Sequence, residues 1–142
     1  PQWFRSEGSI SRDGCRVPLP WEGGVNEANG FSTTGATWLP QPASYANYAR
    51  DKQEGVAGST LELYKRLLKL RKQESLGAGN FSWAPEFQDE ETLAYVNNGI
   101  LVLTNFGSSG VVLPAGEILV TTQHDLTAEH ELEHDQVVWI KL

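Results

Sequence analysis

The sequence predicts a mainly β protein, in which a C-terminal antiparallel β-sandwich follows one helix and a long irregular segment. Three observations support this fold class. Residues 1–58 show no sustained helical or strand period, residues 59–73 carry the clearest helical pattern, and short apolar runs separated by turn residues follow from residue 78 onward. A chain of 142 residues is long enough to bury a core.

The first 58 residues contain most of the chain's turn-forming residues and half of its aromatic ones. They hold five of the seven prolines, eight of the fourteen glycines and seven of the fourteen aromatic residues. Pro and Gly indicate successive turns, whereas disordered segments are poor in aromatic residues. We therefore expect the aromatic side chains to pack on a body that lies outside this chain.

The helix is predicted over residues 59–73, "STLELYKRLLKLRKQ". Ser59 and Glu62 have the spacing of a capping box at its start. Gly77 is a plausible stop. One face of the helix is apolar and carries Leu61, Tyr64, Leu67 and Leu68.

Six short runs after residue 78 predict strands: "AGNFSWAP", "TLAYVNN", "ILVLTNF", "GVVLPAG", "EILVTT" and "QVVWIKL". The "NNG" triplet between Val96 and Ile100 is a strong hairpin signal. Short strands at even spacing predict an antiparallel sandwich, placed as an accessory domain at the end of the chain.

Composition excludes several classes of partner. The net charge of −7 argues against nucleic acid and anionic membranes. Five of the eleven basic residues lie within residues 65–72, which we interpret as the solvated face of the helix. No apolar run reaches the roughly 20 residues of a membrane span.

The single cysteine, Cys15, excludes an internal disulfide and fits a reducing compartment, so we expect a cytoplasmic protein. The absence of methionine and the abrupt start "PQWF" indicate a piece of a longer protein.

The stretch "HELEH", His130 to His134, fits the H-E-x-x-H pattern of zinc metalloproteases. That mechanism needs both histidines on one helical face and a third protein ligand. The surrounding sequence is highly charged and continues directly into a β pattern. In a strand, residues four apart are roughly 13 Å from one another, too far to bind one ion. We therefore interpret the segment as a solvated acidic loop between two strands and expect no metal site. His124 would be a third ligand only if a loop brought its side chain close to His130 and His134.

The segment "SRDGCRVPLPW", Ser11 to Trp21, is more informative. Two arginines, Arg12 and Arg16, flank Asp13, and this proximity keeps the carboxylate ionised and makes it a poor general acid. Guanidinium groups suit fixed hydrogen bonds to sugar hydroxyls or carboxylates. From these residues alone, each arginine is a candidate either for a sugar contact or for an ion pair that holds a loop.

Together with "GFS", "WLPQP" and "STLELYKRLLKLRK", this segment resembles the C-terminal end of α-glucosidases of the α-amylase superfamily, glycoside hydrolase family 13. The oligo-1,6-glucosidase and actinobacterial α-glucosidase branches carry a similar R-D-x-x-R-x-P-x-x-W segment. The resemblance implies that residues 1–76 are the end of a (β/α)8 catalytic barrel whose remainder is absent, with its last helix at residues 59–73. Residues 77–142 would then be the β-sandwich accessory domain.

The resemblance also implies a function. The family cleaves α-glucosidic bonds with retention, using an Asp nucleophile, a Glu acid/base and a second Asp that stabilises the transition state. These carboxylates would precede Pro1, so we expect no catalytic residue in this chain and no glycosidase activity from it alone. Arg16 aligns with an arginine that holds the terminal non-reducing glucose, and Arg12 supports that loop as a second candidate contact. Cys15 would serve packing, with no redox role.

Alternative functions remain at this stage. A trehalose synthase or transglucosidase of the same family would differ mainly around the absent carboxylates. A carbohydrate-binding module would need an exposed row of aromatic residues on the sheet, where we expect Trp83, Phe87 and Trp139 to be core or edge residues. A catalytically inactive heavy chain of an amino-acid transporter would carry a membrane span upstream. The leading hypothesis implies an α-glucosidic oligosaccharide as substrate, no cofactor, no nucleic acid and no membrane partner; it leaves the oligomeric state open.

Overall fold

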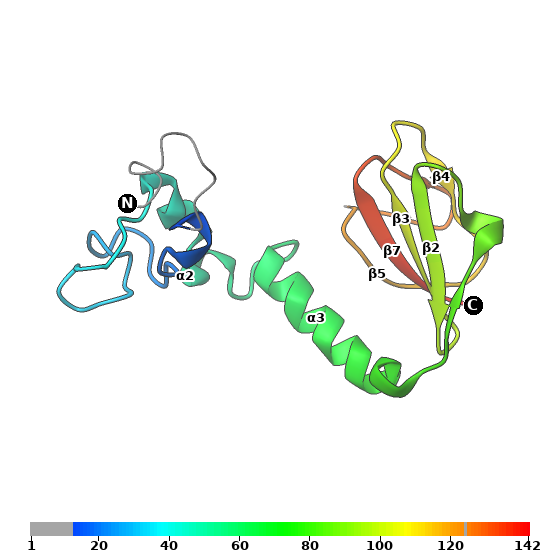
Figure 1. The fold of residues 1–142 in the computed structure, drawn as a ribbon, viewed down its shortest axis with the longest axis horizontal. Coiled ribbons are helices and arrows are strands. Elements are labelled where there is room, and N and C mark those ends of the chain that lie inside the picture. The colour runs from blue at the N-terminus through cyan, green and yellow to red at the C-terminus, as the bar shows by residue number, and fades with distance from the viewer. Residues whose placement is uncertain (1–12, 124) are drawn as a thin grey trace. The chain divides into compact units, whose positions relative to one another are not determined.

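The computed structural model describes residues 13–123 and 125–142. The chain divides into two compact units, residues 1–62 and 63–142. The second unit contains an antiparallel five-stranded sheet and a two-stranded one, which confirms the predicted mainly β fold with a C-terminal antiparallel domain (Figure 1).

The first unit consists largely of turns. Its helices within the described residues are short: η1 (Asp13–Arg16), η2 (Ala43–Tyr48), α2 (Arg50–Gln53) and the first turn of α3 (Thr60–Gln73). Pro18, Ala28, Leu39 and Ala49 are buried, and all of them are small or moderate in size. The large aromatic side chains that are exposed here are Trp21, Phe31, Trp38 and Tyr48. These side chains are among those that we expect a body outside the chain to cover; Trp3 and Phe4 lie outside the described residues.

Helix α3 (Thr60–Gln73) confirms the predicted helix to within one residue. The Ser59 hydroxyl accepts a hydrogen bond from the Glu62 backbone N–H at 3.3 Å, as expected of an N-cap. The Glu62 carboxylate accepts the backbone N–H of Gly55 at 3.0 Å. At the other end the left-handed residue is Ser75, with φ of 54°. The helix therefore ends before Gly77, which lies within the short helix η3 (Leu76–Ala78).

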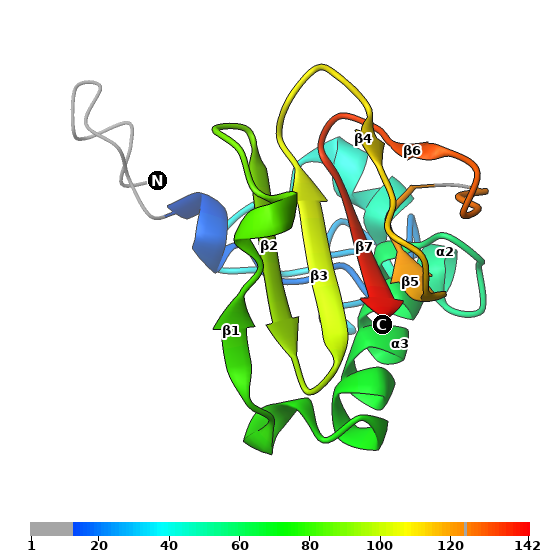
Figure 2. The same cartoon turned by 90° about the vertical axis from the view of Figure 1, so that its right-hand side faces the viewer.

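The larger sheet has the strand order β1-β2-β3-β7-β5, and all its neighbours are antiparallel. Figure 2 shows β1 at one edge and β3 near the centre. The strands are β1 (Phe81–Trp83), β2 (Thr92–Asn97), β3 (Ile100–Asn105), β5 (Glu117–Thr121) and β7 (Gln136–Lys141). Helix η4 (Pro85–Phe87) connects β1 with β2.

The β2–β3 hairpin turns where the "NNG" triplet predicts it. Asn98 and Gly99 are the two turn residues, with φ of 51° and 78°. A two-residue turn with positive φ at both positions matches the twist of the flanking strands, and Asn-Gly is its preferred sequence. This turn sets the register that pairs Asn97 with Ile100.

The smaller sheet pairs β4 (Val111–Val112) with β6 (Glu131–Leu132). The core lies between it and the larger sheet and includes Leu101, Leu103, Leu132, Val138 and Ile140, all fully buried. The six predicted strand segments each contain a strand. The expectation of a loop throughout "HELEH" is wrong for Glu131 and Leu132, because the apolar Leu132 is drawn into the core and its neighbour pairs with Val112.

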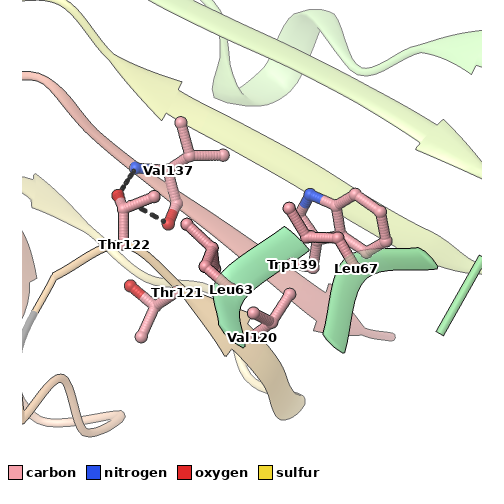
Figure 3. A pocket seen from close by; sticks show the side chains of 7 residues that line it. All are labelled: Leu63, Leu67, Val120, Thr121, Thr122, Val137 and Trp139. Carbon is pink, nitrogen blue, oxygen red and sulfur yellow. Dashed lines mark hydrogen bonds between the residues drawn. The ribbon is translucent and has the colours of Figure 1, made fainter. Parts of the chain in front are cut away.

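Within the second unit, helix α3 packs on one face of the larger sheet. Leu63 and Leu67 point toward Val120 and Trp139, as Figure 3 shows. A small apolar hollow of about 140 Å³ remains between these side chains. The guanidinium group of Arg66 donates to the backbone carbonyl of Leu119 through Nε, at 3.1 Å, and through Nη2.

Candidate substrate-contact site

Arg16 ends helix η1, and its side chain is exposed. Within residues 13–123 and 125–142, no carboxylate side chain that the structure describes forms an ion pair with it. Arg12, the other predicted contact, lies outside the described residues. The structure therefore describes one of the two arginines, and this one presents its guanidinium group to solvent.

The backbone that follows Arg16 is held by a relay of side-chain amides. Gln41 donates from Nε2 to the carbonyl of Pro18 at 2.9 Å. Its Oε1 accepts a hydrogen bond from Nδ2 of Asn29 at 2.7 Å. Gln41 belongs to the "WLPQP" segment and Asn29 immediately precedes the "GFS" segment. The relay thus connects three segments that are separate in the sequence. One of its contacts, the Pro18 carbonyl, lies two residues beyond Arg16.

Asn29 is the centre of this network and is only 7% exposed. Its carbonyl accepts the backbone N–H groups of Trp21 and Glu22, at 2.7 and 2.9 Å. Its Oδ1 accepts the N–H of Gly24 at 2.9 Å. The backbone is left-handed, with φ of 43°, a conformation that Asn tolerates better than most residues. One side chain and one carbonyl therefore fix the course of residues 21–24.

Asp51 provides a second anchor for the same stretch. Its Oδ1 accepts the N–H of Gly23 at 3.0 Å, while its own N–H donates to the carbonyl of Trp21. The hydrogen bond from Gly23, reinforced by the neighbouring Lys52, lowers the pKa of Asp51 below its ordinary value. The carboxylate stays ionised at neutral pH, so it acts as a hydrogen-bond acceptor and does not qualify as a general acid.

An open apolar hollow of about 330 Å³ lies beside these anchors. Its lining residues are Leu19, Pro20, Trp21, Tyr48, Arg50, Gln53 and Leu61. Two polar side chains of this lining are engaged within the unit: Arg50 pairs with Glu54 at 2.6 Å and Gln53 donates to the carbonyl of Tyr48. The hollow therefore offers mainly apolar surface.

The arrangement suits binding better than catalysis. A guanidinium group at the end of an anchored backbone can donate fixed hydrogen bonds to hydroxyl groups. Acid/base chemistry at neutral pH would need a titratable group whose pKa lies near 7. Among the described residues, the carboxyl groups of Asp51 and Asp89 have pKa values below the ordinary one, so neither meets that need. Backbone hydrogen bonds are the main cause in both cases.

The "HELEH" histidines are engaged in local hydrogen bonds. The Nδ1 atom of His130 contacts Oγ1 of Thr127 at 3.0 Å. Nδ1 of His134 contacts the carbonyl of Gly107 at 3.0 Å, and its Nε2 lies 3.2 Å from the Asp135 carboxylate. Among the described residues, no three His, Cys, Asp or Glu side chains gather closely enough to hold a metal ion. His124 lies outside the described residues.

Sequence reasoning did not identify Asn29 and Gln41 as the residues that hold the loop. The weak signals are the asparagine directly before "GFS" and the glutamine flanked by prolines in "WLPQP". The motifs "GFS" and "WLPQP" contribute to the resemblance to a family, which does not assign a physical role to Asn29 or Gln41. Their hydrogen bonds span 12 and 23 residues of sequence, a separation that local patterns do not reveal.

Comparison with protein families places most of the first unit and helix α3 in a known class. Residues 2–79, more than half of the chain, match the α-amylase family, described as the α-amylase catalytic domain.

In the part of the chain that the structure describes, no helix has both the length and the apolar character needed to cross a membrane.

Curated relatives carry α-glucosidase names. The chain is 32% identical over 113 residues to a salivary α-glucosidase of Aedes aegypti, a match that covers 76% of this chain and 19% of the relative. It is 43% identical over 61 residues to a probable α-glucosidase of Rhizobium meliloti, covering 43% of this chain and 10% of the relative. A probable oligo-1,6-glucosidase of Bacillus subtilis is 38% identical over 70 residues, a match that covers 49% of this chain and 12% of the relative. The chain thus spans a fifth or less of these relatives.

Solved structures share the fold. A trehalose-6-phosphate hydrolase of Bacillus licheniformis superimposes with a TM-score of 0.74 at 24% identity, over 97% of this chain and 29% of the enzyme chain. An isomaltulose synthase of Klebsiella sp. LX3 gives a TM-score of 0.75 at 24% identity, over 99% of this chain and 29% of the other. The described fold is therefore one that larger enzymes contain as a part.

Proposed function

The chain belongs to the α-amylase family, and from this membership we propose that it is the C-terminal part of a retaining α-glucosidase. The parent enzyme would remove terminal non-reducing glucose from α-linked oligosaccharides. The observation that carries the proposal is the 113-residue match to an α-glucosidase. That match is longer than either of the two units and so includes residues from both.

In this proposal residues 1–76 are the end of the catalytic barrel, with α3 as its last helix, and residues 77–142 are the accessory sandwich. The family match over residues 2–79 supports this boundary. The exposed aromatic side chains of the first unit support it too, because a barrel against which they pack would remove them from water.

The proposed role of this chain is to bind sugar. Arg16 would donate hydrogen bonds to hydroxyls of the terminal glucose, and Arg12 would support the loop or add a second contact. The exposed guanidinium group of Arg16 and the relay through Gln41 and Asn29 support this assignment. The catalytic carboxylates would come from the preceding part of the enzyme, so the isolated chain would have no activity. We propose no cofactor, and a cytoplasmic location on the strength of the single cysteine.

The first test is the size and activity of the natural polypeptide. A (β/α)8 barrel needs at least about 200 residues, so an antibody to this segment should detect a protein of about 40 kDa or more in source cells. That protein should hydrolyse an aryl α-glucoside with retention, whereas the pure 142-residue chain should not. Turnover by the pure chain would contradict the assignment of the carboxylates. A native band near 15.7 kDa would contradict the parent enzyme.

Arg16 has its own test in the intact enzyme. Arg16→Lys keeps the charge but loses the planar fork of donors, so we expect kcat/KM for an aryl α-glucoside to fall about 10- to 100-fold. Arg71→Lys is the matched control, because Arg71 is an exposed arginine on α3, far along the chain from the loop. Equal kcat/KM values for the two variants would remove Arg16 from the substrate site.

A further inference from the structure

The sequence contains two Asn-Gly pairs, Asn29-Gly30 and Asn98-Gly99. Asparagine is one of the thermally labile residues of proteins. The backbone nitrogen of the next residue can attack its side-chain amide carbon, and this nitrogen is most accessible when the next residue is glycine, which has no Cβ. Both pairs are therefore candidate sites of spontaneous modification, and their surroundings in the structure differ.

The first pair is protected at both of its reacting groups. Asn29 is 7% exposed, its Nδ2 donates to Gln41, and its Oδ1 accepts the N–H of Gly24. The attacking nitrogen would be that of Gly30, whose N–H donates to Oδ1 of Asn26 at 3.3 Å. Reaction at Asn29 would require this network to open first, so we expect it to be slow.

The second pair is open. Asn98 and Gly99 are exposed at the tip of the β2–β3 hairpin, with φ of 51° and 78°. The N–H of Gly99 has no hydrogen-bond partner in the part of the chain that the structure describes. A Cβ added at Gly99 would meet no atom within 4 Å beyond its chain neighbours. Neither the attacking nitrogen nor the access of water therefore requires the strands to separate.

The side chain of Asn98 connects the hairpin to the end of helix α3. Its Nδ2 donates to the carbonyl of Glu74 at 2.8 Å. Glu74 directly follows the last residue of the helix, and its own N–H donates to the carbonyl of Leu70 at 2.8 Å. The last carbonyls of a helix have no partner within the helix. The amide of Asn98 therefore supplies the donor for one of them.

We propose that Asn98 is a modification site of this chain, where deamidation through a succinimide releases the hairpin from the C-terminal end of α3. The inference is independent of the proposed function, because every group that it uses lies in the second unit. It names one asparagine as reactive and assigns a structural consequence to its modification.

The reaction needs no reagent other than water. The backbone nitrogen of Gly99 forms a bond to Cγ of Asn98, and the bond between Cγ and Nδ2 breaks. The proton lost from the Gly99 nitrogen leaves with the side-chain amide as ammonia. Water then opens the succinimide ring. Opening at Cγ gives aspartate, whereas opening at the backbone carbonyl gives isoaspartate, in which the main chain runs through the side chain.

Either product disrupts the contact with α3. An aspartate at position 98 has no donor for the Glu74 carbonyl at neutral pH. It also adds a negative charge at the C-terminal end of the helix, where the helix dipole is already negative. Lys141 does not offset this charge freely, since it pairs with the Glu74 carboxylate at 2.9 Å. Isoaspartate in addition lengthens the main chain in a two-residue turn whose geometry sets the hairpin register.

The first test compares the two pairs within one sample. The 142-residue chain is incubated at neutral pH, folded or in urea, and is then cut with a glutamate-specific protease, which should release residues 28–54 and 92–117. Mass spectrometry locates the conversion of amide to acid. In the folded chain, Asn98 should react at least about tenfold faster than Asn29, whereas the two rates in urea should agree within about threefold. Equal rates in the folded chain, or faster reaction at Asn29, would overturn the inference.

The second test identifies the product. A carboxyl methyltransferase specific for isoaspartate, supplied with labelled S-adenosylmethionine, should label the aged chain. Asn98→Ser cannot form the succinimide at this position, so most of the labelling should be lost in that variant. Equal labelling of the two chains would place the reactive residue elsewhere and overturn the assignment of Asn98.

The third test measures the consequence for the helix. Asn98→Asp reproduces one product and should lower the Tm of the second unit by at least about 4 °C. Asn47→Asp makes the same chemical change at an exposed position of η2, and it should shift that Tm by less than about 2 °C. Equal Tm values for the two variants would show that deamidation does not release the end of α3.

Discussion

At the scale of single residues, the candidate loop depends on polar side chains more than on apolar ones. Asn29 and Gln41 connect segments of the first unit that are 12 and 23 residues apart in the sequence. Buried polar groups cost free energy when they lose a partner, so a closed relay favours one loop conformation over others. The backbone two residues beyond Arg16 is therefore held by the side-chain amides of Gln41 and Asn29.

Asn29→Ala tests this relay. The variant leaves the N–H of Gly24 and the amide of Gln41 without their partner and places Ala in a left-handed conformation. We expect the free energy of unfolding of the first unit to fall by about 1–3 kcal/mol, measured by urea denaturation followed through tryptophan fluorescence. Asn47→Ala is the control, because Asn47 is exposed on η2. A loss as small as that of the control would show that the relay contributes nothing to stability.

At the scale of elements, the join between α3 and the sheet depends on a β-bulge. The β5–β7 register pairs Ile118 with Ile140 and Val120 with Trp139, so Leu119 is the extra residue. A bulged residue is left out of the strand ladder. The carbonyl of Leu119 is then available to Arg66, which donates to it through two nitrogens. An irregularity in the strand thus becomes the attachment point of the helix.

Arg66→Met should weaken this attachment. Methionine retains the aliphatic stem but has no donor for the Leu119 carbonyl, so we expect the second unit to lose about 1.5–3 kcal/mol of stability. Thermal or urea denaturation of the isolated chain measures the loss. Lys69→Met, an exposed basic position on the same helix, should change stability by less than about 0.5 kcal/mol. Similar losses for both variants would mean that the Leu119 hydrogen bonds contribute little.

At the scale of the whole molecule, the two units differ in how they are stabilised. The second unit has a core cluster in which Leu101, Leu103, Leu132, Val138 and Ile140 are fully buried. In the described part of the first unit, the buried apolar residues are Pro18, Ala28, Leu39 and Ala49, which remove little surface from water. Because hydrophobic stabilisation scales with buried apolar area, the first unit of the isolated chain should open more easily.

Amide hydrogen exchange would reveal this difference. In the isolated chain, we expect the slowest exchange in β3, where all six residues are buried and both neighbours are paired. Amides of residues 21–35 should exchange at least about tenfold faster, because opening the first unit costs less free energy. Joining the chain to a barrel should slow exchange in residues 21–35 selectively. Equal protection of both regions in the isolated chain would contradict the expected order of stability.

Local sequence patterns were sufficient for several features. Helix α3 follows from its apolar spacing and its Ser59 cap, and the β2–β3 hairpin follows from Asn98-Gly99, because both structures depend on residues close together in the chain. The six strand segments follow from short apolar runs between turn residues. Arg16 remains a candidate that rests on the resemblance of its motif.

Other features were beyond the reach of local patterns. Strand β6 exists because Leu132 reaches the core and Glu131 pairs with Val112, across nineteen residues of sequence. The end of α3 at Gln73 depends on Ser75 adopting the left-handed conformation that we expected of Gly77. Whether Trp83 belongs to the core or the surface depended on which face of the sheet it occupies, and strand pairing shows that it lies away from the core.

By itself, the sequence determined the order of elements, the family and the hairpin turn, because local propensity and short motifs encode them. Only the tertiary structure decided how the Arg16 loop is held, where α3 attaches to the sheet, and which aromatic residues are left uncovered. Those outcomes depend on hydrogen bonds and strand pairs between distant residues, such as Gln41 with Pro18 and Arg66 with Leu119. Such contacts stabilise the structure only after folding has brought the distant segments together.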